Sequence, residues 1–230
     1  MNTAITSTVI VAPGPAATVP GSLVVTQSTG AGAALRLRHA EWLYEQGVSS
    51  AGALSRVLWA LTPEVTDRTD PTTGRPLADP RRYQGRSSTR VVLITNYWTT
   101  GREALRKAGL TVNGAYRVVP GTAQPDPGEE TAGRLFLIDR LRDLLPRVNL
   151  VLPPEPMDEH PDVIDRHTLR SAMGAVQARP RTVDEATDAA VLDRHELLIL
   201  AVALGVHDVG SRASGFASRA PRQGLQRVGR

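Results

Sequence analysis

The chain lacks cysteine and has few aromatic residues. Of its 230 residues none is cysteine, 4% are aromatic, and the 27 basic residues include a single lysine, Lys107. The absence of cysteine excludes disulfides, zinc–thiolate sites, iron–sulfur clusters and thiol nucleophiles. Because hydrophobic residues still make up 41% of the chain, a core is feasible, built mainly from Leu, Val, Ile and Ala.

Long apolar runs are also lacking. The longest, Leu197–Val206, has about ten residues, whereas a membrane-spanning helix needs about twenty. Residues 1–32 carry no charged side chain, so the positive region that opens a secretory signal is absent. We therefore expect a cytoplasmic protein with no membrane partner.

Charge is divided unevenly along the sequence. Residues 81–118 carry a net charge of +7 and residues 209–230 one of +5, whereas residues 119–208 between them carry −7. Basic islands of this kind indicate a polyanionic partner, most often nucleic acid. The near-exclusive use of arginine is also typical of a coding bias, which would enrich any surface in arginine.

Two helices are predicted early in the chain. Residues 33–46 place apolar side chains at i, i+7 and i+8 of one stripe, with His39 on the same side. Residues 51–61 place theirs at i, i+3, i+4 and i+7, the amphipathic helical pattern. Joined by the short segment 47–50, the two form a helix-turn-helix outline.

The strongest local signal follows a short β-branched run, Arg90–Thr95, which suits a buried strand but also fits a helical stripe. Thr100 and Glu103 fit a capping box that opens a helix over residues 101–108. Asn113-Gly114 then fits the two-residue turn of a β-hairpin.

This order of elements, two helices, a third capped helix and a small hairpin, resembles the winged helix-turn-helix class over about residues 33–120. The resemblance implies a mainly α fold with a small β-hairpin, in which a winged-helix-like module is followed by a small helical module. It also implies a third helix that reads DNA and a wing that contacts the DNA backbone. The long loop at 62–89, with six Pro or Gly residues, departs from the usual pattern.

The remaining segments complete the predicted organisation. Residues 1–32 are expected to be a flexible N-terminal arm, the alternative being that they hold one short strand at Leu23–Gln27. Residues 121–128 are expected to be a linker, 129–208 an acidic helical module and 209–230 a disordered basic tail. Helices are predicted within the acidic module over about 129–145, 163–177 and 183–204. The apolar half of the last helix is either the core of this module or the seam of a homo-oligomer.

Motifs for catalysis or metal binding are not evident. His160, Asp162, Asp165 and His167 lie close together in the sequence, but their spacing matches no known metal-binding motif. Phosphate-binding, dinucleotide-binding and serine-hydrolase motifs are absent as well. We therefore expect no catalytic residues, no metal and no cofactor.

The candidate nucleic-acid-binding residues are the basic side chains of the first island. Arg102 and Arg106 share a face of the capped helix, Lys107 lies beside them, and Arg117 lies in the hairpin. The complete set is Arg81, Arg82, Arg86, Arg90, Arg102, Arg106, Lys107 and Arg117.

The sequence thus predicts a DNA-binding regulator or accessory factor without catalytic activity, acting in transcription regulation. Its predicted partner is nucleic acid, in the first place double-stranded DNA, with a homo-oligomer formed through residues 183–204. The alternative is a structural or adaptor component of a larger protein assembly, with floppy terminal arms.

Overall fold

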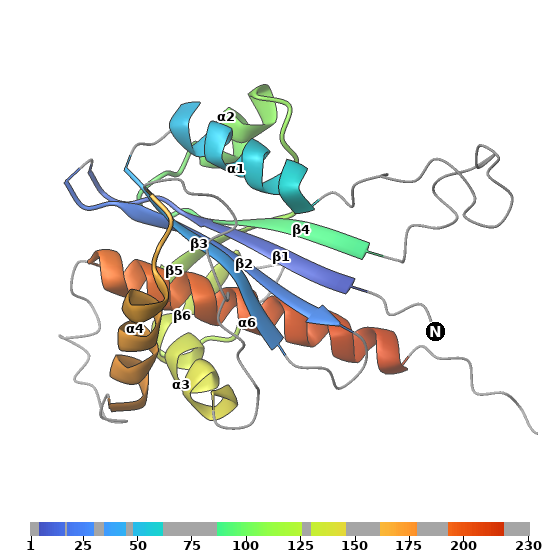
Figure 1. Ribbon diagram of the computed structural model, residues 1–230, viewed down its shortest axis with the longest axis vertical. Helices are drawn as coiled ribbons and strands as arrows, with labels where there is room; N and C mark the ends of the chain where they lie inside the picture. The colour runs from blue at the N-terminus through green and yellow to red at the C-terminus, as the bar shows by residue number, and fades with distance from the viewer. Residues whose placement is uncertain are drawn as a thin grey trace, which may run out of the picture.

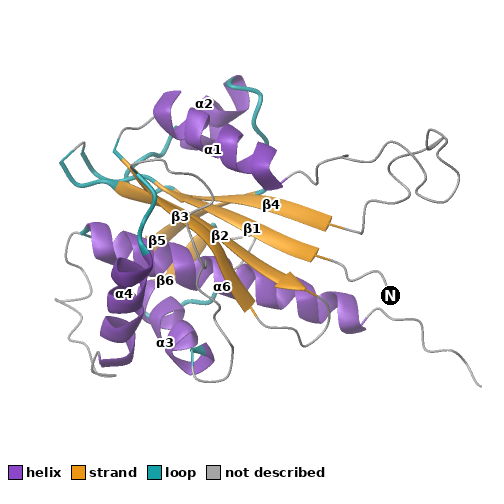
Figure 2. Ribbon diagram, viewed as in Figure 1, coloured by secondary structure: helices purple, strands orange, loops and turns teal. Residues whose placement is uncertain are grey.

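A computed structural model of the chain describes six strands and five helices. The residues that it describes are 5–16, 18–29, 35–44, 48–61, 87–125, 130–145, 162–178 and 193–218. The six strands form one mixed sheet, and helices lie on both of its faces (Figures 1 and 2). The prediction of a mainly α fold with a small hairpin is therefore wrong, because the protein has an α/β fold.

The first forty residues supply three antiparallel strands. They are β1 (Ile5–Ala12), β2 (Gly21–Thr29) and β3 (Leu35–Leu43), and β2 pairs with both of the others. The content of Val, Ile and Thr in β1 and β2 suits a pleated surface. Two of these strands occupy the segment expected to be a flexible arm, and β3 replaces the helix predicted over 33–46.

The other three strands continue the sheet from β1 in parallel orientation. β4 (Ser87–Ile94) pairs with β1, β5 (Gly114–Val119) with β4, and β6 (Thr131–Gly133) with β5. The sheet order is β3-β2-β1-β4-β5-β6. All strands except β2 thus run the same way, and their ends meet at one edge, which we call the carboxyl edge.

Two layers of helices enclose the sheet (Figure 1). On one face lie α1 (Val48–Leu61) and α2 (Gly101–Lys107). On the other lie α3 (Arg134–Leu144), α4 (Arg166–Ala178) and α6 (Arg194–Ser218). We refer to these as the α1/α2 face and the α6 face. Four helices lie near the predicted helices over 51–61, 101–108, 129–145 and 163–177. The last, α6, overlaps the helix predicted over 183–204 but continues through residues 209–218, so the expectation of a disordered tail over 209–230 is wrong for that part. Residues 183–192 and 219–230 lie outside the described residues.

Alternation along the strands builds a core on each face. In β1, Ile10 and Ala12 join the α6-face core, whereas Val9 and Val11 join the α1/α2-face core. The apolar half of α6, Leu197–Leu204, is buried against the sheet. These side chains are core residues of one chain, so they do not form the seam of an oligomer. Although α6 has 25 residues, no helix within the described ranges combines the length and apolar character of a membrane span.

The winged helix-turn-helix interpretation is wrong, because its first helix is the strand β3 and its wing does not exist. Thr100 makes no side-chain capping hydrogen bond to α2, and Glu103 instead pairs with Arg106. Asn113 does not turn a hairpin: its Oδ1 accepts from Val91 N over 2.8 Å. The strand that follows, β5, is parallel to β4, and a parallel pair requires a crossover, here α2, rather than a tight turn.

Candidate functional site

A β-bulge in β3 changes which side chains reach the α1/α2 face. Leu37 pairs with Thr26 of β2, but the next paired residue, His39, opposes Val25, so Arg38 is an additional residue. The bulge reverses the alternation, because Leu35 and Leu37 face α6 before it and Ala40 faces α6 after it. Bulges of this kind re-aim side chains and are frequent beside functional sites.

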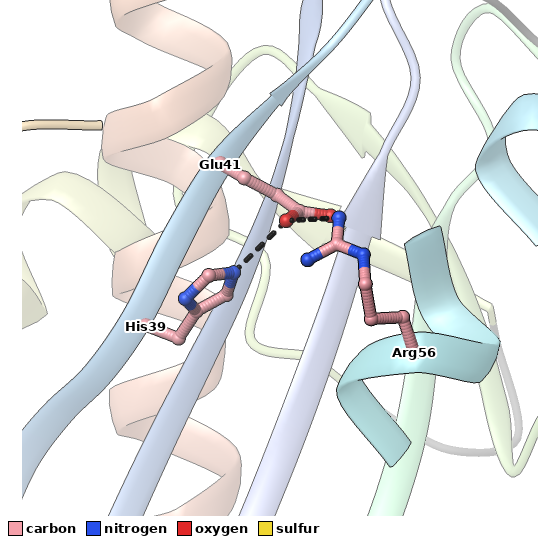
Figure 3. Close-up of polar contacts among 3 residues, drawn as sticks. All are labelled: His39, Glu41 and Arg56. Atoms are coloured by element: carbon pink, nitrogen blue, oxygen red, sulfur yellow. Dashed lines mark hydrogen bonds and ion pairs between the residues drawn. The ribbon is translucent and has the colours of Figure 1, made fainter. Parts of the chain in front are cut away.

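Beyond the bulge, three polar side chains meet between β3 and α1 (Figure 3). Glu41 Oε2 lies 3.0 Å from His39 Nε2 and accepts a hydrogen bond from Arg56 Nη2 over 2.8 Å. The side chains of Glu41 and His39 are 1% and 3% exposed, and that of Arg56 is 32% exposed. Burial alone would raise the pKa of Glu41, but the contacts with His39 and Arg56 outweigh it and hold the pKa below the ordinary value.

The cluster His39–Glu41–Arg56 therefore contains a buried, ionised carboxylate. This carboxylate ties α1 to β3 and fixes the orientation of the imidazole. A substrate on the protein surface would not reach His39 or Glu41, since both are enclosed. We assign the cluster the role of positioning α1 and the bulged strand. No local sequence pattern predicted it, because residues 33–46 fitted a helical stripe.

The α1/α2 face of the sheet is divided into an apolar half and a polar half. Toward the carboxyl edge it carries Val9, Val11, Leu23, Val25, Val91 and Leu93, which pack with α1 and α2. Toward the other edge, one register row crosses four strands through Arg36, Gln27, Ser7 and Thr89. We call these four residues the polar row.

The predicted nucleic-acid-binding residues lie in different places. Arg102 and Arg106 of α2 are exposed and form ion pairs with Glu130 and Glu103, and Lys107 lies 4.0 Å from Glu103. Arg117 is exposed on β5, on the same α1/α2 face.

Arg90, in contrast, points to the α6 face and pairs with Asp208 over 2.8 Å. The structure therefore separates it from the residues on α2. Arg81, Arg82 and Arg86 lie outside the described residues.

The residues singled out for metal binding do not form a centre. Asp165 accepts hydrogen bonds from Thr168 N and Oγ1, so it caps the first turn of α4 and its pKa is lowered by these bonds. His160 lies outside the described residues. Within the described ranges, no three His, Asp or Glu side chains are grouped closely enough to hold a metal ion.

The carboxyl ends of β1 and β4 lie at a switch point of the sheet, because the strand order changes direction between these two strands. In open α/β sheets such a switch point is the usual ligand site. Divalent cations are most often held by carboxylates, but β1 and β4 contain no Asp or Glu. Glu196 at the start of α6 is paired with the buried Arg134. The residues that the structure describes at this edge therefore form no divalent-metal centre.

No protein-family model matches the chain, and no curated protein sequence matches it significantly. Among solved structures, it is similar to one described as the human cytomegalovirus terminase nuclease domain, soaked with Mn. The two are 11% identical, the match covers 89% of this chain and 85% of that one, and the TM-score is 0.40. A similarity at this level does not show that the two proteins share an activity.

The functional interpretation drawn from the sequence is nevertheless wrong. A regulator of the winged-helix class needs a module that the sheet replaces, so transcription regulation has no support in the fold. The expectation of a protein without catalytic activity relied on the lack of catalytic motifs in the sequence. It is not retained, because the solved structure that the chain is similar to is a nuclease domain. The adaptor alternative relied on floppy arms, but residues 5–12 and 21–29 are strands of the sheet.

Proposed function

We propose that the protein acts in nucleic-acid processing and binds its nucleic acid, double-stranded DNA in the first place, on the α1/α2 face. The observation that carries the proposal is a difference in charge between the two faces. Seven basic and three acidic described residues lie on the α1/α2 face, a net charge of +4, whereas the side chains that the structure describes on the α6 face include seven of each. The bases of the α1/α2 face are Arg36, Arg38, Arg56, Arg102, Arg106, Lys107 and Arg117, and its acids are Glu41, Glu103 and Glu130.

The acids on this face leave its positive charge largely accessible. Glu41 is buried beneath α1. Glu103 and Glu130 pair with α2 side chains that are more than half exposed. Exposed ion pairs contribute only about 0–1 kcal/mol, so phosphate groups can replace these carboxylates as partners of the arginines.

Four of the eight predicted binding residues belong to this surface: Arg102, Arg106, Lys107 and Arg117. A phosphate backbone would meet them as a sequence-independent polyanion, with affinity that falls steeply as salt rises. Arg90 is excluded from the proposal because it serves the ion pair with Asp208 on the α6 face.

Fluorescence anisotropy with a labelled 20-base-pair duplex and with its single strand tests the proposal. Replacing Arg102 and Arg106 by Gln should lower the slope of log affinity against log salt by about two, since each lost phosphate contact removes about 0.9. The matched control replaces Arg166 and Arg170 of α4, which are exposed on the α6 face, and should leave the slope unchanged. Absent or salt-independent binding would refute the proposal, as would an equal loss in both variants. Incubating bound DNA with Mg²⁺ or Mn²⁺ and resolving the products then identifies the reaction.

A further inference from the structure

We infer that the polar half of the α1/α2 face is a strip that binds the sugar–phosphate backbone, formed by Arg36 and Arg38 of β3 with Gln27 and Thr89. The inference rests on the proposed function and deepens it, because it names a second subsite away from α2 and a mode of recognition: backbone rather than base.

The first support is that three strands change character at the same register. The apolar row Val25, Val9 and Val91 is followed by the polar row, in which Gln27 pairs with Ser7 and Ser7 with Thr89. If an apolar layer covered this part of the sheet, the residues facing it would remain apolar in all three strands. The change therefore marks a face that meets water or a polar partner.

The second support is the geometry of β3. Arg36 continues the row beside Gln27, and the bulge adds Arg38, so both exposed guanidinium groups lie at one end of it. Gln27 Nε2 donates to Ser7 Oγ over 3.1 Å and lies partly buried over that hydroxyl. At a strand spacing of about 4.8 Å, the row from Arg36 to Thr89 spans about 14 Å. That is the axial length of about four base pairs of duplex.

The third support is charge complementarity. β1, β2 and β4 contain no acidic residue, and the carboxylate of β3, Glu41, is already engaged by His39 and Arg56. Within the described part of the chain, Arg36 and Arg38 form no ion pair. The neighbouring Gln27 amide and Thr89 hydroxyl add neutral donors for phosphate oxygens.

The composition of the strip also defines what it reads. Its side chains are Arg, Gln and Thr, with no aromatic ring on which an unpaired base could stack; Ser7 of the polar row is buried. The occupant is therefore a phosphodiester chain, bound without sequence preference, and not an array of exposed bases.

The experiment compares three double variants by anisotropy on two duplexes of unrelated sequence, from 50 to 200 mM salt. They are R36Q/R38Q in the strip, R102Q/R106Q on α2 and R166Q/R170Q as the control, and urea unfolding establishes that each is folded. For R36Q/R38Q the slope should fall by about two on both duplexes, and its affinity deficit should shrink by about tenfold across this salt range.

Three outcomes would overturn the proposed strip, and they differ in whether the proposed function is retained. If R36Q/R38Q retains the wild-type slope while R102Q/R106Q loses it, the strip is wrong and the proposed function stands. If the wild-type protein binds neither duplex, both fail. A third outcome also contradicts the strip: R36Q/R38Q binds DNA normally but loses binding to poly-glutamate, which would assign the arginines to an acidic protein partner.

Discussion

Thr8 and Asp208 lie 200 positions apart in the sequence, yet the hydroxyl of Thr8 donates to Asp208 Oδ2 over 2.6 Å in a buried contact. The other carboxylate oxygen, Oδ1, accepts from Arg90 Nη1 over 2.8 Å. One carboxylate on α6 therefore joins the two parallel strands β1 and β4 and holds the helix in register with both.

Replacing Asp208 by Ala should lower the free energy of unfolding by about 2 kcal/mol. Hydrogen bonds to charged groups contribute about 1.5–3 kcal/mol each, and the value is discounted because the Arg90 side chain is 23% exposed. Urea denaturation measures the change. Asp139→Ala is the control: Asp139 is half exposed and pairs with Arg142 one turn away, so its loss should be below about 1 kcal/mol. Equal effects of the two substitutions would contradict the role of Asp208.

Two glycines of α6 should respond to alanine in opposite ways. A Cβ at Gly205 would lie 2.8 Å from Thr26 Oγ1 and 3.2 Å from Ile10 Cγ1, whereas nothing lies within 4 Å of one at Gly210. Gly210→Ala should stabilise the protein by up to about 1 kcal/mol through helix propensity. Gly205→Ala should destabilise it by about 1 kcal/mol, because α6 must move away from β2. Thermal melts of both variants test this; stabilisation by Gly205→Ala would show that α6 does not approach the sheet so closely.

Acid should weaken the attachment of α1 through Glu41. Its pKa in the folded protein is lowered from the ordinary 4.5, so the unfolded chain takes up the proton first as the pH falls. The stabilisation by Glu41 is complete above about pH 4.5 and is lost as the pH falls from there through the lower folded pKa.

The test is urea unfolding of the wild type and of Glu41→Gln at a series of pH values. The wild type should lose stability more steeply than the variant below pH 4.5, because only the wild type carries this titrating carboxylate. Parallel curves over that range would contradict an ionised, paired Glu41.

Substitutions at Leu200 distinguish between two interpretations of α6, a core helix and the seam of an oligomer. Its side chain is fully buried in the α6-face core. Leu200→Ala should cost about 2–5 kcal/mol, and Leu200→Asp should unfold the protein, since a buried unpaired charge is not tolerated. Tyr44→Asp, at a side chain that is 45% exposed, should remain folded. A folded Leu200→Asp protein of lower native mass would restore the oligomer seam.

Local signals in the sequence predicted several elements correctly and their arrangement incorrectly. The amphipathic spacing over 51–61 corresponds to α1, and the β-branched run at 90–95 lies mostly in β4. Both patterns depend on neighbours a few positions away. The pairing of β4 with β1 depends on residues more than 80 positions apart, which no local pattern reports.

The cluster His39–Glu41–Arg56 could not be predicted from the sequence, for a particular reason. In β3 the bulge at Arg38 shifts the alternation by one residue, so that Leu35, His39 and Trp42 imitate a helical stripe although they lie on a strand. The strands β1 and β2 were missed because buried Ser and Thr, such as Thr8 and Ser22, give a polar composition like that of a flexible arm. The basic residues on α2 were predicted as candidates because their grouping is visible in the charge pattern alone, and their role remains a prediction.

The placement of α6 over β1 sets the order in which the protein can be completed during synthesis. β1 is translated before the other strands of the sheet, but the helix that covers Ile10 and Ala12 is translated after every other described element. Until α6 has been made, those side chains are exposed to water. Completion of the sheet must therefore wait for α6, which makes folding slow and dependent on contacts between distant residues. Nascent chains that stop before α6 present an open apolar sheet and should be clients of chaperones rather than stable intermediates.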